Sequence, residues 1–433
     1  MLYLQLVFDN PKIGNVDIAL SLMKTLLINI HQLVQIREAE VLRVAGSDMR
    51  DLPTLDNAWL LINKDRIEDF GPMKTAPLNA TKKIIDCSER IVMPTYCDSH
   101  SHIVYAGDRV DEFVQRLEGK SYQEIAELGG GILNSAKRLG KTSERQLYQQ
   151  AAARLEQCAY LGTGALEIKS GYGLNLEAEL KMLRVAKQLA KKYPVAIKTT
   201  FLGAHALPQD YRGRKQEYIK HICQDMIPEV ATQELAAYID VFCEEGYFNL
   251  EDTKQVLQAG AKFGLKGKIH VNQFNAIGGV ALGVAMGALS VDHLEQLTDE
   301  DLNALEQSQT MPVALPGCSL FLDIPFTPAR AIIDRGLPLA LATDFNPGSA
   351  PSGNMNLILS LGCMRMKMTP AEAINAATIN GAYAMGLEAT HGSITRGKMA
   401  SLIITDPLKH YSHIPYDFGQ NHIDQVILNG RLL

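Results

Sequence analysis

Four side chains from distant parts of the chain could together bind one transition-metal ion. His100 and His102 stand two residues apart, shortly after the apolar run 91–94. Alternate residues of an extended segment share one face, so both rings can reach the same ion. His270 and Asp344 each end another apolar run. Three imidazoles and one carboxylate suit zinc or iron, and an open coordination position would hold a water whose pKa the ion lowers toward neutrality.

His293 ends a further apolar run and adds a second group able to move a proton. Asp344 can touch both the ion and the water and so shuttle a proton. His293 could instead polarise the attacked carbonyl or assist the same transfer. The residue types leave open which of the two is the main base. A set of separately hydrogen-bonded core groups is the competing interpretation, and it does not explain why all of them fall at the ends of apolar runs.

These residues need a scaffold that gathers the ends of many strands. Eight short apolar runs, separated from the second onward by gaps that fit a helix, are typical of an α/β fold of the (β/α)8 TIM barrel type. The runs are 91–99, 165–170, 197–204, 239–244, 267–272, 289–293, 311–316 and 337–343. Helical periodicity is clear at 177–192 and again at 371–385. In a barrel the carboxyl ends of the strands meet at one mouth, where the candidate ligands would converge.

The two ends of the chain predict a second, smaller unit. Strand patterns at 25–33, 58–69, 401–405 and 423–432 favour a small β-sandwich domain formed from the N- and C-terminal segments. The expected division is an N-terminal extension at 1–22, the first part of the small domain at 23–90, the barrel at 91–395 and the second part of the small domain at 396–433. Between the first two runs, residues 103–164 with the glycine triplet 129–131 predict an insertion over the barrel mouth.

Other polar residues near the same mouth could select a substrate. Arg109 follows His102 closely and could clamp a carboxylate with two hydrogen bonds. Its alternative is a surface ion pair with Asp108 or Asp111. The loop 170–173, which contains Tyr172, follows the second run.

Three further residues sit at or near run ends. His205 and Glu244 end the third and fourth runs, where they could contact substrate or support the ligands. Lys169 could be carbamylated to bridge two metals, but a single metal is favoured. Lys169 is then expected to be an ion-pair partner that holds a loop.

Composition narrows the classes of partner. The 433 residues carry a net charge of −6 without a basic stripe, which argues against nucleic acid and anionic membranes and favours a small-molecule partner. We find no apolar run long enough to span a membrane and no secretory signal, so a cytoplasmic location is expected. The seven cysteines include no CxxC pair, so they predict reduced thiols and leave metal binding to His and Asp.

Four motifs resemble the imidazolonepropionase family of the amidohydrolase superfamily. They are DSHSH at 98–102, EIKSGYGL at 167–174, TFLGAH at 200–205 and TDFNPGS at 343–349. The HxH element is shared across the superfamily, whereas the second and fourth motifs are more particular to this family. The similarity runs from about residue 23 to the end.

The resemblance implies hydrolysis of the cyclic amide 4-imidazolone-5-propanoate to N-formimidoyl-L-glutamate in histidine degradation. It implies a homodimer with one zinc or iron ion per subunit, held by His100, His102, His270 and Asp344, and a water on that ion as the nucleophile. The residues it places in contact with substrate or product are Arg109, Tyr172, His205, Gln273, Asn346, Gly348 and Ser349.

One departure affects the expected chemistry. Some relatives carry Glu at the position of Gln273, and an amide cannot transfer a proton as that carboxylate can. Gln273 can only orient water or substrate, which leaves the proton transfers to Asp344 and His293. A mononuclear deaminase of cytosine or guanine is an alternative, but it generally needs an acid where Gln273 stands. A metal-free assembly subunit is another, although such a protein should have lost ligands that are all present here.

Overall fold

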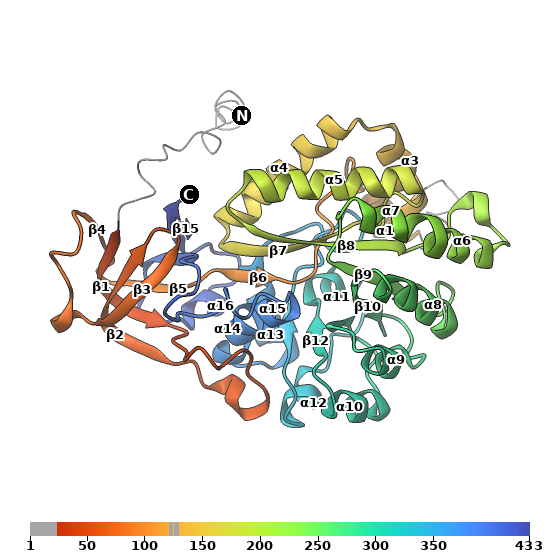
Figure 1. The fold of residues 1–433 in the computed structure, drawn as a ribbon. Coiled ribbons are helices and arrows are strands. Elements are labelled where there is room, and N and C mark those ends of the chain that lie inside the picture. Colours follow the sequence, from red (N-terminus) through yellow and green to blue (C-terminus); the bar gives the residue numbers. More distant parts are fainter. Residues whose placement is uncertain (1–23, 121–123, 125–129) are drawn as a thin grey trace.

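The computed structural model describes residues 24–120, 124 and 130–433. Two eight-stranded sheets organise this part of the chain, one forming a barrel and the other standing beside it (Figure 1). The predicted barrel with a small β unit built from both chain ends is confirmed. The predicted extension at 1–22 and the first glycine of the triplet 129–131 lie outside the described residues.

The barrel consists of eight parallel strands in chain order. They are β6 (Tyr96–Asp98), β7 (Thr163–Lys169), β8 (Ala196–Ala204), β9 (Tyr238–Cys243), β10 (Lys266–Val271), β11 (Ser290–His293), β12 (Met311–Ala314) and β13 (Ala340–Leu341). A parallel bridge between Ser101 and Phe345 joins the segments that follow β6 and β13. The first and last strands are thus connected just beyond their carboxyl ends, which is where the candidate ligands stand.

Helices surround the barrel, and some of them pack directly on its strands (Figure 1). They are α1 (Val110–Leu117), α3 (Gly131–Lys141), α4 (Glu144–Tyr160), α5 (Leu176–Lys192), α6 (Lys215–His221), α7 (Ile227–Thr232), α8 (Leu250–Ala261), α9 (Gly279–Ala285), α10 (Asp299–Glu306), α11 (Pro316–Leu322), α12 (Ala329–Asp334), α13 (Met355–Met366), α14 (Pro370–Ala377), α15 (Ile379–Ala384) and α16 (His413–Tyr416). The helix predicted at 177–192 is confirmed as α5. The helix predicted at 371–385 is instead two helices, because the backbone leaves the helical region at Thr378, whose φ and ψ are −117° and −89°.

The second sheet joins strands from both ends of the chain. They are β1 (Thr25–Val34), β2 (Thr54–Asn63), β3 (Arg66–Pro72), β4 (Lys83–Asp86), β5 (Arg90–Pro94), β14 (Leu402–Pro407), β15 (Ile423–Leu428) and β16 (Arg431–Leu432). The single strand predicted at 58–69 is a hairpin, because Lys64 turns the chain with a positive φ of 58°. The division of the chain into domains stays a prediction.

The run predicted as one first barrel strand, 91–99, serves both sheets. β5 pairs with β1 and β14 in the small sheet, whereas β6 pairs with β7 in the barrel. The change takes place at Thr95, whose N–H donates to Ser401, and Tyr96, whose N–H donates to Gly162. The prediction of a single strand is wrong, because buried strands of both sheets share the same apolar pattern. The pattern therefore does not show where one strand ends and the next begins.

Close packing of α15 against β6 depends on Gly381. A Cβ at this position would lie 2.3 Å from the carbonyl oxygen of Cys97. We expect Gly381→Ala to lower the free energy of unfolding by about 1–3 kcal/mol, because overpacking forces backbone shifts in a dense core. Urea denaturation measures the change. Gly140→Ala is the control, since Gly140 is exposed on α3 with no heavy atom within 4 Å of the added Cβ, and its stability should be unchanged or slightly higher.

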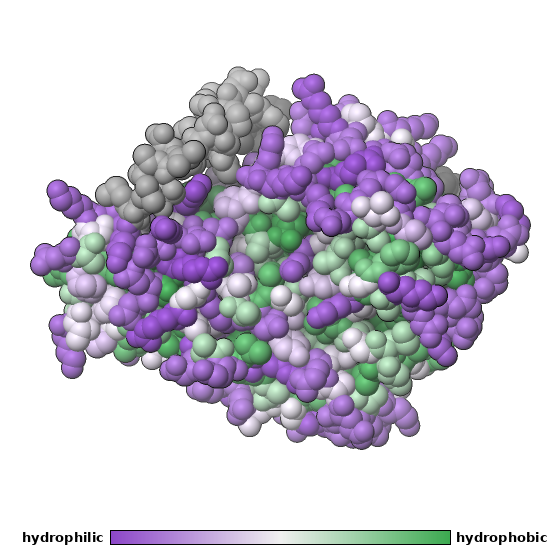
Figure 2. Space-filling view, in the orientation of Figure 1, coloured by the Kyte–Doolittle hydropathy of each residue, from purple (hydrophilic) through white to green (hydrophobic). Residues whose placement is uncertain are grey.

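Hydrophilic side chains cover much of the face seen in the space-filling view, with apolar ones scattered among them (Figure 2). Within residues 24–120, 124 and 130–433, every helix is too short or too polar to cross a bilayer.

Candidate active site

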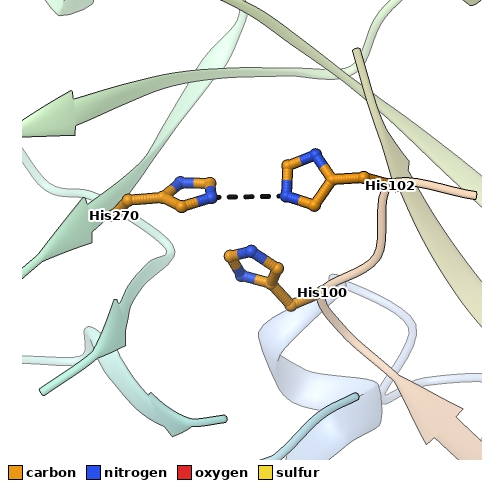
Figure 3. Close-up of side chains that lie close together, drawn as sticks. All are labelled: His100, His102 and His270. Atoms are coloured by element: carbon orange, nitrogen blue, oxygen red, sulfur yellow. Dashed lines mark hydrogen bonds between the residues drawn. The ribbon is translucent and has the colours of Figure 1, made fainter. Parts of the chain in front are cut away.

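The three predicted histidine ligands converge at the mouth of the barrel. His100 and His102 follow β6, and His270 lies near the end of β10. One ring nitrogen from each falls within 4.8 Å of the others, and the Nε2 atoms of His102 and His270 are 3.4 Å apart (Figure 3). All three side chains are buried. Buried imidazoles that face one another in this way are suited to share an ion.

Asp344 follows the last barrel strand, β13, and completes the group. Its Oδ1 lies 3.5 Å from Nε2 of His100 and 3.6 Å from Nε2 of His102. The backbone N–H of Asp344 donates to the carbonyl of His100, which holds the two segments together. Burial raises the pKa of the Asp344 carboxyl above its ordinary value, although His293 and His270 act in the opposite direction. The four predicted ligands are therefore brought together.

His293 stands beside this group at the end of β11. Its ring centroid is 5.5 Å from that of His270 and 5.8 Å from that of His100. Its Nδ1 lies 3.3 Å from a carboxylate oxygen of Glu295. Burial alone would lower the pKa of His293, but Glu295, together with Asp344 and Asp292, raises it above its ordinary value.

Two of these residues have strained backbones. Asp344 and His293 have φ values of 54° and 90°, which L-residues rarely adopt. Such strain persists only where the surroundings over-determine it, as they often do at functional sites.

Two buried aspartates hold the outer nitrogens of the ligand rings. Asp292 on β11 lies 2.6 Å from Nδ1 of His100, and Asp240 on β9 lies 3.0 Å from Nδ1 of His270. The contact of Asp292 with His100 is a hydrogen bond, and a carboxylate that accepts from Nδ1 fixes the tautomer that leaves Nε2 free to bind an ion. Asp240 faces Nδ1 of His270 at ion-pair distance. Sequence reasoning missed both residues, although a lone acidic residue within an apolar strand, as in Ile239-Asp240-Val241, is a usable signal.

Burial also keeps the rings of His100 and His102 neutral. Burial is the largest cause that lowers the pKa of His100 and of His102 well below the ordinary value, and nearby positive charge adds to the effect. Neutral imidazole is the form that binds a metal ion. For Asp240, burial would raise the pKa, but His270 and Lys169 lower it well below its ordinary value.

Lys169 lies among the barrel strands and does not hold a loop, contrary to the prediction from the sequence. It is completely buried at the end of β7, and its Nζ lies 2.7 Å from Asp240, 2.8 Å from Glu167 and 3.5 Å from Asp292, all on barrel strands. Burial would lower the pKa of Lys169, but these three carboxylates raise it. The expected ion pair is present, but its expected location in a loop is wrong, because two of the three partners, Asp240 and Asp292, are distant in sequence.

A pocket of about 470 Å³ opens beside the histidine cluster. All seven residues that the resemblance placed in contact with substrate line it, namely Arg109, Tyr172, His205, Gln273, Asn346, Gly348 and Ser349. The ring of His205 stacks on that of His102 at 5.5 Å, so the pocket adjoins the candidate ligands directly. Burial, helped by His270, lowers the pKa of His205 to about 3, so its ring is neutral.

Arg109 belongs to the pocket wall and not to a surface ion pair with Asp108 or Asp111. Its Nε and Nη2 lie 2.7 and 2.5 Å from Oε2 of Glu112. The other carboxylate oxygen of Glu112 accepts a hydrogen bond from the N–H of Gly131, at the start of α3. Glu112 therefore orients the guanidinium, a role that sequence reasoning missed.

Neutral and acidic groups after β9 and β10 shape the rest of the site. Gln273 donates from Nε2 to Sγ of Cys318 at 3.2 Å. Glu244 accepts hydrogen bonds from the N–H of Phe274 and from the side chain of Asn275, so it supports the loop after β10. A parallel barrel that gathers three histidines and an aspartate beside an open pocket defines a hydrolase of the amidohydrolase type.

Comparison with known proteins agrees with this class and narrows it. An amidohydrolase family model matches residues 274–433. The imidazolonepropionase of Flavobacterium johnsoniae is 59% identical over 95% of this chain and 100% of its own length, and that of Clostridium tetani is 40% identical over 90% and 93%. The chain belongs to the imidazolonepropionase family.

Solved structures show the same fold at much lower identity. Guanine deaminase of E. coli superposes with a TM-score of 0.72 at 12% identity, covering 95% of this chain and 98% of that one. A mutant of atrazine chlorohydrolase from Arthrobacter aurescens, complexed with zinc and atraton, gives 0.70 at 15% identity, covering 94% and 95%. At these identities the likeness extends to the fold alone.

Proposed function

We propose that this chain hydrolyses the cyclic amide of 4-imidazolone-5-propanoate and forms N-formimidoyl-L-glutamate in histidine degradation. The observation that carries the proposal is that the four candidate ligands lie beside a pocket whose wall contains Arg109. Relatives named imidazolonepropionase, up to 59% identical over nearly the whole chain, support the same substrate.

The donor set fits one zinc or iron ion per subunit, held by His100, His102, His270 and Asp344. Among the described residues, Nε2 of His100 has no hydrogen-bond partner, although it is buried and lies 3.5 Å from Oδ1 of Asp344. A buried polar atom without a partner is costly, and an ion would satisfy it. When bound, the ion would lower the pKa of a water molecule and stabilise negative charge on the attacked carbonyl.

The chain's own residues move protons and orient the ring. One water adds to the ring carbonyl carbon, the ring C–N bond breaks, and the leaving nitrogen takes up one proton. We assign to Asp344 and His293 the transfer of this proton: they accept it from the attacking water and return it to the leaving nitrogen. Gln273, held by Cys318, orients the substrate without exchanging a proton.

Turnover of 4-imidazolone-5-propanoate, followed by the loss of its absorbance, tests the proposal. Cytosine and guanine are assayed in parallel for release of ammonia. Ring opening without ammonia release from either base is expected. Ammonia release without imidazolone turnover would support the deaminase alternative, and an inactive, metal-free chain would support an assembly role.

Arg109 is proposed to bind the propanoate carboxylate of the substrate. Loss of a charged hydrogen-bonding group costs about 1.5–3 kcal/mol. We therefore expect Arg109→Ala to raise KM by about 10- to 100-fold and to leave kcat within about threefold, because the interaction is the same in substrate and transition state. Steady-state kinetics measure both constants. Arg184→Ala is the matched control, since the Arg184 guanidinium also pairs with carboxylates, those of Glu144 and Glu177, but does not line the pocket. Equal effects of the two variants would contradict the assignment.

A homodimer and a cytoplasmic location are also proposed, the first from the family resemblance and the second from the sequence. Light scattering during size-exclusion chromatography determines the oligomeric state.

A further inference from the structure

Two completely buried lysines lie inside the barrel beneath the histidine cluster. Lys169 ends β7, and Lys268 lies on β10 two residues before His270. Both contact Glu167, Lys169 at 2.8 Å and Lys268 by a short ion pair. Buried cations are costly unless they are paired, so the role of each lysine follows from the groups with which it pairs.

The two lysines differ in their other partners. Lys268 donates to the carbonyl oxygens of Ser99 and Ala384, both at 3.1 Å. Lys169 instead contacts the Oδ2 atoms of Asp240 and Asp292, at 2.7 and 3.5 Å. Only Lys169 therefore joins the two carboxylates that support ligand histidines.

The contacts form one continuous path from Lys169 to two rings. Asp240 reaches Nδ1 of His270 at 3.0 Å and Asp292 reaches Nδ1 of His100 at 2.6 Å, through the same oxygen atoms that face Lys169. Two carboxylates in a buried, low-dielectric region repel each other strongly. A cation that both of them face removes this repulsion and fixes both oxygens.

We propose that Lys169 is a positioning residue for the metal centre, since its single charge holds Asp240 and Asp292 where they orient His270 and His100. The inference rests on the proposed function, because it requires that these histidines bind an ion. His102 stands outside this arrangement, since its Nδ1 faces the carbonyl of Ser170 at 3.4 Å. Loss of Lys169 should therefore loosen two of the three histidine ligands together.

Lys169→Met and Lys268→Met provide a matched comparison. Both remove one buried charge that pairs with Glu167, so both should lower the melting temperature. Zinc affinity is measured on each metal-stripped, folded variant by competition with a chromophoric chelator. We expect Lys169→Met to weaken zinc binding by about 10- to 100-fold, and Lys268→Met to change it by less than about threefold, as expected when only one of them supports the ligands.

Equal losses of zinc affinity in the two variants, or none in Lys169→Met, would overturn the proposal. If either methionine variant does not fold, Lys169→Arg and Lys268→Arg make the same comparison with the charge kept. The bulkier guanidinium displaces the shared contact point, so weaker zinc binding is expected for Lys169→Arg alone, and equal affinities would overturn the role of Lys169. Failure of the unmodified chain to bind zinc or iron would instead refute the proposed metal centre.

Discussion

Asp344→Asn is expected to lower kcat/KM by about 10³-fold or more, because one side chain serves as both a ligand and a proton-transfer group. Its carboxylate lies 3.5 and 3.6 Å from the Nε2 atoms of His100 and His102. An amide is a poorer ligand and cannot accept the proton. The fold should be kept, since Asn has the same shape and tolerates the positive φ of 54° at this position.

Asp252→Asn is the control for this substitution. Asp252 is also buried, but it caps α8 and contacts Asn249, Gln216 and Lys215. The control should retain most of the turnover and lose some stability. Circular dichroism and metal analysis of both variants separate a chemical effect from a folding effect. A folded, metal-loaded Asp344→Asn protein with turnover within about tenfold of the unmodified chain would refute the assignment.

The convergence of the ligands could be predicted because it follows from topology. In a parallel barrel every strand delivers its carboxyl end to one mouth, so a polar residue at the end of an apolar run is placed without knowledge of its neighbours. His270, His293 and Asp344 were found in this way. All eight predicted barrel strands also overlap observed barrel strands, because apolar runs mark buried strands well.

The contacts of the supporting groups could not be predicted, because they depend on which strands are neighbours and which way each side chain points. Asp292 precedes His293 directly, yet it serves His100, which is 192 residues away. Likewise Lys169 gives no sign in the sequence of its contacts with Asp240 and Asp292. Arg109 shows a different limit, since it pairs with Glu112, three residues away, although Asp108 and Asp111 are closer in sequence. Charge pairing inside a core is set by tertiary contacts.

The change of sheet at Thr95 could not be predicted for a different reason. β5 and β6 are both mostly buried and are separated by Thr95 alone, so periodicity shows one run. Only the partners distinguish them, β14 for the first and β7 for the second. The consequence is functional, because the small sheet anchors the chain immediately before the segment that carries His100 and His102.

Removal of the metal ion is expected to abolish turnover and to leave the barrel folded. The ligand cluster is a small part of a large core, so the apoprotein should keep its secondary structure. Its melting temperature should fall, because an ion that binds only the folded state stabilises that state. Buried histidines whose Nδ1 atoms face Asp240 and Asp292 are already oriented for binding, so one equivalent of zinc or iron should restore turnover.

Chelation followed by metal analysis and reconstitution tests this expectation. About one ion per chain is predicted. His293, Glu295 and Cys318 form a second group that could hold a metal. The number of ions per chain therefore distinguishes one occupied site from two. Cys318→Ala is the control for the number of ions alone. It removes one possible ligand from that second group and none of the four proposed ligands, but it also removes the hydrogen-bond partner of Gln273. If restoring turnover requires two ions per chain, and Cys318→Ala reduces the number to one, the prediction of a single-metal site is wrong. Turnover that survives complete removal of the metal would exclude metal-dependent hydrolysis, because the remaining residues in the pocket then suffice to activate water.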